Sequence, residues 1–168
     1  MSSVAAFYGD NAALYDRIAT VPPVGRWRAR AVAALDLDAG DTVTVSGPFG
    51  RNYYEGERRV VVLAGGPGIG PAVAIAERAL GEDSEAAIVY RDDAPVHEDR
   101  LADIAAAGAD VFVLTGEEPL TDATAAALSG ADGEQTFVYG FSDFLANAEA
   151  AIEATGLDPD AAKAENFG

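Results

Sequence analysis

The stretch that decides the fold runs from residue 60 to residue 71 and reads Val60-Val61-Val62-Leu63-Ala64-Gly65-Gly66-Pro67-Gly68-Ile69-Gly70-Pro71. Its first half is an aliphatic, β-branched run typical of a buried parallel strand. Its second half is a glycine-rich turn that leads into an alanine-rich helix. Glycines let the backbone approach an anion closely, and the N-terminus of a helix attracts negative charge. The stretch therefore predicts a phosphate cradle, with a tight structural connection as the alternative.

The spacing of the glycines differs from two well-known phosphate motifs. Pro71 stands where the dinucleotide fingerprint G-x-G-x-x-G requires its third glycine. No Gly-Lys-Ser/Thr follows the turn, so it is not a P-loop either. The stretch alone therefore predicts an anion site but does not identify the ligand.

After this stretch, short β-branched runs alternate with alanine-rich runs, which is typical of βαβ units. Strands are predicted at residues 60–64, 86–90, 110–114, 136–139 and 162–167. Helices are predicted at residues 70–80, 97–107, 122–129 and 142–155. In the last helix Ser142 is the expected N-cap residue, and Gly156 followed by Pro159 ends it. The predicted fold class is α/β, with a doubly wound sheet of five parallel strands.

The segment before residue 59 has a different character. Residues 7–37 are rich in Ala, Leu and Arg and predict two short helices around a proline-containing break at residues 21–25. Residues 42–45 have strand composition, and a Gly-Pro-Phe-Gly turn stops that strand at residues 47–50. We therefore expect a helical leader at residues 1–40, a strand and loop at residues 41–58, and an α/β domain at residues 59–168.

The charge balance limits the partners of the protein. Asp and Glu number 28 against 11 Lys and Arg, and the formal net charge is −17. Nucleic acids and anionic membranes require clustered cations, so neither is an expected partner. Lys163 is the only lysine. An acidic, lysine-poor, alanine-rich chain is typical of proteins from salt-accumulating, haloarchaeal-type organisms, with an acidic mesophilic protein as the alternative.

Several classes of chemistry are excluded by what the sequence lacks. It has no cysteine, so disulfides, thiolate metal sites and a cysteine nucleophile are ruled out. His97 is the only histidine and is expected in the first turn of a helix; no metal site is predicted. The N-terminus does not resemble a signal peptide, and no apolar run reaches membrane-spanning length. We expect a soluble, cytoplasmic protein.

Four motifs, taken in order, resemble those of the ferredoxin-NADP reductase superfamily over about residues 40–168. They are Gly47-Pro48-Phe49-Gly50, the turn at residues 64–71, Phe137-Val138-Tyr139-Gly140-Phe141 and Glu165-Asn166-Phe167-Gly168. These flavoproteins have an FAD-binding barrel followed by a nicotinamide-dinucleotide domain. The resemblance implies the strand order 3-2-1-4-5. It also implies an NAD(P)H-binding oxidoreductase domain in which hydride passes between nicotinamide and flavin.

The resemblance also implies which residues contact cofactors. In the family the Gly-Pro-x-Gly segment closes the flavin barrel, a place that falls on Phe49 and Gly50. The Gly-Gly-x-Gly-Ile turn holds the NAD(P) pyrophosphate, and the corresponding segment comprises Gly65, Gly66, Gly68, Ile69, Gly70 and Pro71.

Three further contacts follow from the same resemblance. Arg91 ends the second predicted strand, where the family has a polar or basic residue near the adenosine ribose. Arg91 could pair with a 2′-phosphate, whereas Asp92 and Asp93 would repel one, and an ion pair within this trio is the alternative. Tyr139-Gly140-Phe141 replaces the Cys-Gly-Pro that the family places beside the nicotinamide. Phe167 resembles a near-terminal aromatic that lies against flavin, with a core side chain as the alternative.

Residues 4–43 resemble a second family, the class I S-adenosylmethionine-dependent methyltransferases. The likeness rests on Tyr15-Asp16-Arg17-Ile18-Ala19 and on the helical segment at residues 26–37. The Gly-x-Gly-x-Gly loop that should follow is absent, because residues 44–50 read Thr-Val-Ser-Gly-Pro-Phe-Gly. Methyl transfer is therefore disfavoured.

Three functions remain to be compared. The segment before Arg59 is too short for a complete flavin barrel, which disfavours FAD binding by this chain alone. We expect a nicotinamide-dinucleotide domain that works with a flavin-bearing or electron-acceptor protein. The alternatives are a methyltransferase and a non-catalytic α/β interaction module, so the sequence leaves open whether the chain is itself an enzyme.

Overall fold

A computed structural model of the chain describes residues 52–116 and 118–167. All of them lie in the second of the chain's two units, residues 50–168. The expectations for residues 1–51 lie outside the described residues. These expectations are the helical leader, the strand at residues 42–45, the Gly-Pro-Phe-Gly turn and the methyltransferase-like segment.

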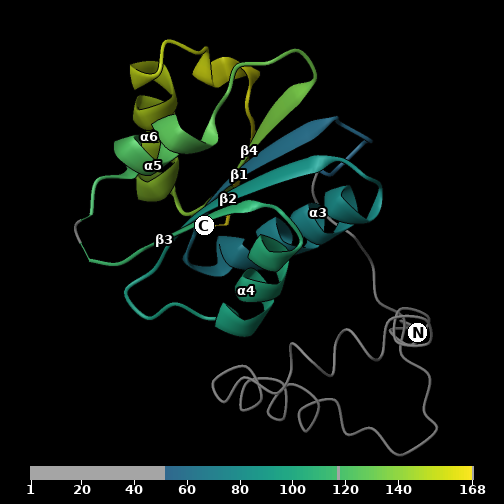
Figure 1. Cartoon of the computed structure of the whole chain (residues 1–168). Helices are drawn as coiled ribbons and strands as arrows, with labels where there is room; N and C mark the ends of the chain where they lie inside the picture. Colours follow the sequence, from purple (N-terminus) through teal and green to yellow (C-terminus); the bar gives the residue numbers. More distant parts are fainter. Residues whose placement is uncertain (1–51, 117, 168) are drawn as a thin grey trace, which may run out of the picture. The chain divides into compact units, whose positions relative to one another are not determined.

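The described residues contain a sheet of five parallel strands in the order β3-β2-β1-β4-β5 (Figure 1). The bounds are β1 Arg59–Gly65, β2 Glu85–Arg91, β3 Asp110–Leu114, β4 Glu134–Gly140 and β5 Lys163–Asn166. β1 is the central strand, and its residues 60–64 are completely buried, as expected when helices cover both faces of a parallel sheet. The predicted strands and their order are confirmed.

Helices cover both faces of the sheet. The α-helices are α3 Ile69–Gly81, α4 Glu98–Ala106, α5 Leu120–Ala127 and α6 Ser142–Ala154, and the short 3-10 helices are η1 Gly66–Gly68 and η2 Pro159–Ala161. Figure 1 shows α3 and α4 on one face and α5 and α6 on the other. Alternate residues of β1 belong to two hydrophobic cores, one on each face of the sheet. Val60 and Val62 pack toward α3 and α4, and Val61 and Leu63 pack toward α5 and α6. None of the helices in residues 52–116 and 118–167 could span a membrane.

One predicted helix cap is wrong. Phe141, not Ser142, is the N-cap residue of α6, with φ −85° and ψ 165°, and Ser142 is the first helical residue. The Ser142 hydroxyl is instead used in the tertiary structure, because it pairs with Nδ2 of Asn166 at 2.9 Å. The predicted end of α6 is confirmed, since Gly156 follows the helix with φ +84°.

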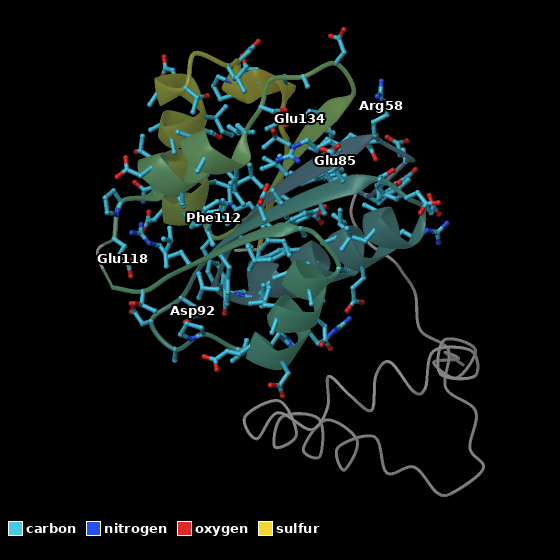
Figure 2. The ribbon with its side chains drawn as sticks, viewed as in Figure 1. Arg58, Glu85, Asp92, Phe112, Glu118 and Glu134 are labelled. Carbon is cyan, nitrogen blue, oxygen red and sulfur yellow. The ribbon has the colours of Figure 1, made fainter. Side chains whose placement is uncertain are left out.

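A charged cluster ties together the amino ends of four strands. Arg59 Nε donates to Glu134 at 2.9 Å, Nη1 donates to Glu85 at 3.0 Å, and Nη2 donates to the Ala127 carbonyl at 2.9 Å. Nη2 also lies 3.6 Å from the carboxylate of Asp110. The Arg59 side chain is 17% exposed and that of Glu134 only 4%. Figure 2 shows Glu134 and Glu85 at this edge of the sheet and Asp92 at the other.

The cluster makes stability depend on acid pH. Burial acts to raise the pKa of Glu134, but hydrogen bonds from Ser129, Gly130 and Arg59 outweigh it and lower the pKa below 4.5. A carboxylate whose pKa is lower in the folded state contributes stability above its unfolded pKa and loses it as pH falls through the folded pKa. We expect the free energy of unfolding in urea to fall on acidification below about pH 5. The loss should be smaller in Glu134→Gln, and equal losses in the two proteins would contradict this role.

Candidate functional site

The carboxyl edge of the sheet is where the predicted cofactor residues meet. β1 pairs with β2 on one side and β4 on the other, so the direction in which the chain winds across the sheet reverses between β1 and β4. Ligands of open α/β sheets bind in the crevice at such a switch point. The turn η1 follows β1 at this place and leads directly into α3.

The glycines of the turn have different roles. A Cβ on Gly68 would overlap the carbonyl oxygen of Tyr139 and lie 2.8 Å from its carbonyl carbon, so this glycine lets the turn pack on β4. A Cβ on Gly65 would lie 2.6 Å from a ring carbon of Phe144, which packs over the end of β1. Gly66 has φ +52°, a conformation that favours glycine, and Gly70 has open space around it. Close packing therefore explains why glycine stands at positions 65 and 68. Gly66 and Gly70 have room around them, so these two positions can be approached by a ligand.

The start of α3 carries no negative charge. Its first turn has no acidic residue and its N-cap makes no side-chain hydrogen bond. The first turns of α4, α5 and α6 contain Glu98 and Asp99, Asp122, and Asp143 respectively. In a chain with net charge −17, α3 thus retains the positive N-terminal dipole that its neighbours neutralise. Of the remaining predicted residues here, Ile69 is buried and Pro71 partly buried.

The end of β2 presents a cation and an anion to opposite faces. Arg91 pairs in register with Gly65 and Leu114, and its Nε is buried without a hydrogen-bond partner among the described residues. Strand alternation places its side chain on the face covered by α5 and α6. The predicted alternative of an ion pair with Asp92 or Asp93 is wrong, because Arg91 forms no ion pair with any described residue.

Asp92, which the sequence analysis named only as a residue that would repel a 2′-phosphate, is held by two side-chain hydrogen bonds beside the glycine turn. Its Oδ1 accepts from the N–H of Ala94 at 2.9 Å, and its Oδ2 accepts from the hydroxyl of Tyr90 at 3.1 Å. The same Oδ2 lies 3.9 Å from the position of a Cβ on Gly66. A hydrogen-bond acceptor therefore borders the glycine turn. The alternation of β2 was the available signal, since it puts Tyr90 and Asp92 on one face.

Tyr139 lies in the core and not on an open surface. It is 2% exposed, and its hydroxyl donates to the carbonyl of Asn52 at 2.5 Å. Burial raises its pKa, and the charges of Glu165 and Glu57 add to this effect, so the phenol stays protonated. Its ring stacks on Phe137 at 6.3 Å between centroids. The position that the resemblance places beside nicotinamide is thus filled by a packed aromatic ring.

The other two predicted aromatics, Phe141 and Phe167, are both exposed. Phe141 is 52% exposed beside the start of α6, and Phe167 is 37% exposed. The N–H of Phe167 donates to the Gly140 carbonyl at 3.0 Å, and its ring stacks on Tyr139 with centroids 6.3 Å apart. A Cβ on Gly140 would lie 2.7 Å from the Phe144 ring, so Gly140 is also a packing glycine. The predicted contacts Phe49 and Gly50 lie outside the described residues.

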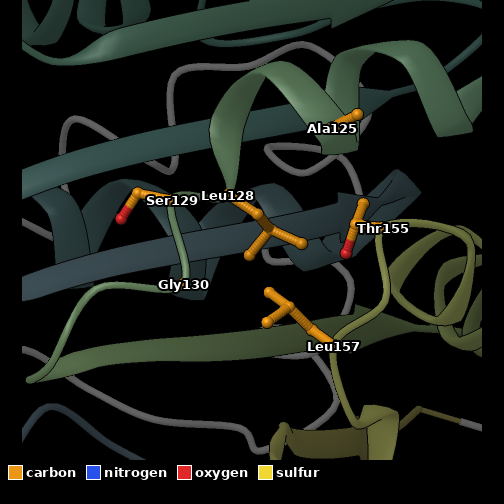
Figure 3. A pocket seen from close by; sticks show the side chains of 6 residues that line it. All are labelled: Ala125, Leu128, Ser129, Gly130, Thr155 and Leu157. Carbon is orange, nitrogen blue, oxygen red and sulfur yellow. The ribbon is translucent and has the colours of Figure 1, made fainter.

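His97 and a cavity between two helices lie apart from this site. His97 is the N-cap residue of α4, with φ +63°, and burial followed by the Arg100 charge lowers its pKa. No group of metal-binding side chains exists in the described part of the chain. A cavity of about 270 Å³ lies between the ends of α5 and α6, where Leu128 and Leu157 face each other (Figure 3). None of the predicted cofactor residues lines it.

Comparison with known proteins supports the assignment of the fold. A scan of the sequence against models of protein families finds no match. Over 59 residues the chain is 41% identical to a probable dihydroorotate dehydrogenase B (NAD(+)) electron transfer subunit of Methanopyrus kandleri, covering 35% of this chain and 21% of that protein. In structure it is similar to the Amycolatopsis cytochrome P450 reductase GcoB, with a TM-score of 0.57, 25% identity and coverage of 79% of this chain and 46% of that one.

A second solved structure has the same architecture. The flavohem-like FAD/NAD-binding domain of nitric oxide dioxygenase from Vibrio cholerae matches with a TM-score of 0.59 at 21% identity, covering 79% of this chain and 61% of that one. The chain therefore spans less than two thirds of each relative. These likenesses confirm the fold that the four sequence motifs predicted.

Proposed function

We propose that this chain, which has the fold of ferredoxin-NADP reductase-type FAD/NAD-binding domains, binds a nicotinamide dinucleotide at the carboxyl edge of its sheet and serves electron transfer to a flavin. The observation that carries the proposal is the η1 turn, which brings the N-terminus of α3, whose first turn contains no acidic residue, to the switch point between β1 and β4. Comparisons with reductases and an electron transfer subunit favour this function over methyl transfer and over a non-catalytic module.

The residues of the chain fit the dinucleotide in three ways. The backbone of Gly66 is accessible and its φ of +52° suits close approach to a pyrophosphate. The α3 dipole favours the negative charge of that group, while the carboxylate of Asp92 accepts hydrogen bonds from a neighbouring sugar. When bound, the nicotinamide supplies the hydride, and the role of the chain is to bind and orient the cofactor.

A flavin is better assigned to another protein or to residues outside the described range. Phe167 packs on Tyr139. The sheet and its helices account for the described residues without an antiparallel barrel among them. We therefore propose a flavin-bearing or electron-acceptor partner, in keeping with a match to an electron transfer subunit. The high acidity of the chain suggests that binding be measured in molar potassium chloride.

The first test is ligand-dependent stability. NADH and NADPH are each added to the full chain, and the thermal unfolding midpoint is compared with that in FAD or S-adenosylmethionine. A ligand at 100 times its dissociation constant stabilises the native state by about 2.7 kcal/mol. We expect a nicotinamide dinucleotide to raise the midpoint. Stabilisation by S-adenosylmethionine alone would contradict the proposal.

A substitution in the turn locates the binding site. Gly66→Ala adds a Cβ and backbone strain where the pyrophosphate approaches, so we expect dinucleotide affinity to fall by about tenfold or more. Gly156→Ala is the matched control, because it also places a Cβ at positive φ but at the end of α6 with open space around it. Both changes should lower stability by about 1 kcal/mol, and only Gly66→Ala should weaken binding. Equal affinities in the two variants would exclude the turn as the site.

A further inference from the structure

We propose that residues 52–57, which we call the strap, position the glycine turn of the dinucleotide site through Tyr139, and that Lys163 keeps the strap in place. The inference rests on the proposed function, because it concerns the affinity of the same site. Lys163 pairs in register with Phe137, two residues before Tyr139 on β4. Its ammonium group therefore lies away from the carboxyl edge, and Lys163 is a positioning residue that acts through the strap.

Two sets of side-chain contacts fasten the strap to β5. At its start, Nδ2 of Asn52 donates to the carbonyl of Ala164 at 2.7 Å. At its end, Nζ of Lys163 lies 2.6 Å from the carboxylate of Glu55 and 3.0 Å from that of Glu57. Both ends of the strap are therefore held by the same edge strand.

Lys163 is the only lysine of the chain, and it balances the charge of the strap. Glu55 and Glu57 form no ion pair with any other described residue. Burial acts to lower the pKa of Lys163, but hydrogen bonds to the two glutamates outweigh it and raise the pKa, so the amine stays charged. Its Nζ also lies 5.2 Å from the centre of the Phe137 ring, within range of a cation–π interaction. Without this charge the two carboxylates would repel each other beside β5.

Tyr139 connects the strap to the glycine turn. Its hydroxyl donates to the carbonyl of Asn52 in the strap at 2.5 Å, and its ring stacks on Phe137 and on Phe167. The backbone of Tyr139 touches the turn, since a Cβ on Gly68 would overlap its carbonyl oxygen. If the strap moved away, the buried hydroxyl would lose its acceptor, and the cost of leaving it unpaired favours a shift of Tyr139. Such a shift displaces Gly68, the N-cap residue of α3.

Binding of a dinucleotide to the full chain, followed by nicotinamide fluorescence at fixed salt, tests the role of Lys163. The probe is NADH or NADPH, whichever stabilises the unaltered chain more. Lys163→Met removes the charge and keeps most of the side-chain volume, and Tyr54 of the strap stays packed on the core, so this variant should still fold. We expect its dissociation constant to rise about fivefold or more, the lower end of typical coupling between two sites. Lys163→Arg retains the charge and should restore the affinity to within about twofold of the unaltered protein.

A second substitution tests whether Lys163 acts through Tyr139. Tyr139→Phe keeps the stacked ring and removes the hydroxyl that joins it to the strap, so it should also weaken dinucleotide binding about fivefold. If both residues act by one route, the double variant should bind about as weakly as the weaker single variant. Fully additive losses would show that the two residues act independently, and they would overturn the proposed route.

The coupling between strap and site has a second readout in the unaltered protein. If the strap strengthens dinucleotide binding, the bound dinucleotide must stabilise the strap by the same factor. Lys163 is the only lysine, so its reaction with an acetylating reagent, measured from the mass of the peptide that contains it, reports opening of the strap. We expect a saturating dinucleotide to slow this reaction about fivefold. An unchanged rate would contradict the coupling.

Arg100→Met is the matched control for the loss of an ion pair. The Arg100 side chain is 25% exposed and that of Lys163 is 24% exposed. Arg100 Nε donates to Glu77 at 2.9 Å and thereby joins α4 to α3. This variant should lower the thermal unfolding midpoint by a similar amount and leave dinucleotide affinity unchanged. Equal losses of affinity in Arg100→Met and Lys163→Met would show a general effect of destabilisation and would overturn the inference.

The outcomes separate this inference from the proposed function. If the unaltered chain binds neither NADH nor NADPH, both are overturned. If Lys163→Met binds the dinucleotide as tightly as the unaltered chain, the positioning role of Lys163 is overturned, and dinucleotide binding at the glycine turn stays in place.

Discussion

Replacing Glu134 by alanine is expected to lower the free energy of unfolding by about 3 kcal/mol, because the largely buried Arg59 guanidinium loses its buried partner and keeps only the exposed carboxylates of Glu85 and Asp110. The Arg59 side chain, which is 17% exposed, would lose the only one of its carboxylate partners among the described residues that is itself buried. The N–H groups of Ser129 and Gly130 would lose their acceptor as well. The substitution therefore removes both an ion pair and the hydrogen bonds that hold the loop between α5 and β4.

Urea unfolding of Glu134→Ala beside Glu85→Ala measures this effect with an internal control. Glu85 contacts the same guanidinium at 3.0 Å, but its side chain is 74% exposed, so its removal should cost less than about 1 kcal/mol. Molar salt should further reduce the loss of stability in Glu85→Ala, and it should leave most of the loss of stability in Glu134→Ala. Similar losses in the two variants would show that burial of Glu134 does not determine the strength of the cluster.

The elements of the sheet could be predicted because their signals are local. The aliphatic run of β1 and the β-branched runs of β2 and β3 each occur within a few residues, and parallel strands require crossover helices between them. The Arg59 cluster could not be predicted, because Arg59 and Glu134 are 75 residues apart and meet only once the strand order is known. The failure of Ser142 as an N-cap has the same origin, since its hydroxyl is used by Asn166 on β5.

The sequence predicted where the candidate site lies, but it did not predict the roles of the individual residues. A glycine-rich turn between strand and helix indicates a phosphate cradle, and the structure puts that turn at the switch point of the sheet. Which glycines serve packing depended on Phe144 and on the backbone of Tyr139, whose proximity no local pattern reveals. Likewise, the burial of Tyr139 depends on Asn52, which is 87 residues away.

Gly68→Ala is expected to be the most damaging change in the glycine turn. The added Cβ would overlap the carbonyl oxygen of Tyr139, and this obstacle is backbone of a central strand, which cannot rotate away. Relief requires the turn to move off β4, so we expect a loss of stability of about 3 kcal/mol, at the upper end for overpacking. Because that movement also displaces the start of α3, dinucleotide affinity should fall with it.

Gly70→Ala provides the comparison that isolates this close approach. Gly70 is two residues further along, in the first turn of α3, and a Cβ there meets nothing within 4 Å. Alanine favours helix more than glycine, so this variant should unfold in urea at the same concentration or a higher one, with a gain of up to about 1 kcal/mol. If Gly68→Ala were as stable as Gly70→Ala, the turn would not be held against β4. The need for glycine at position 68 would then come from the bound ligand and not from packing against β4.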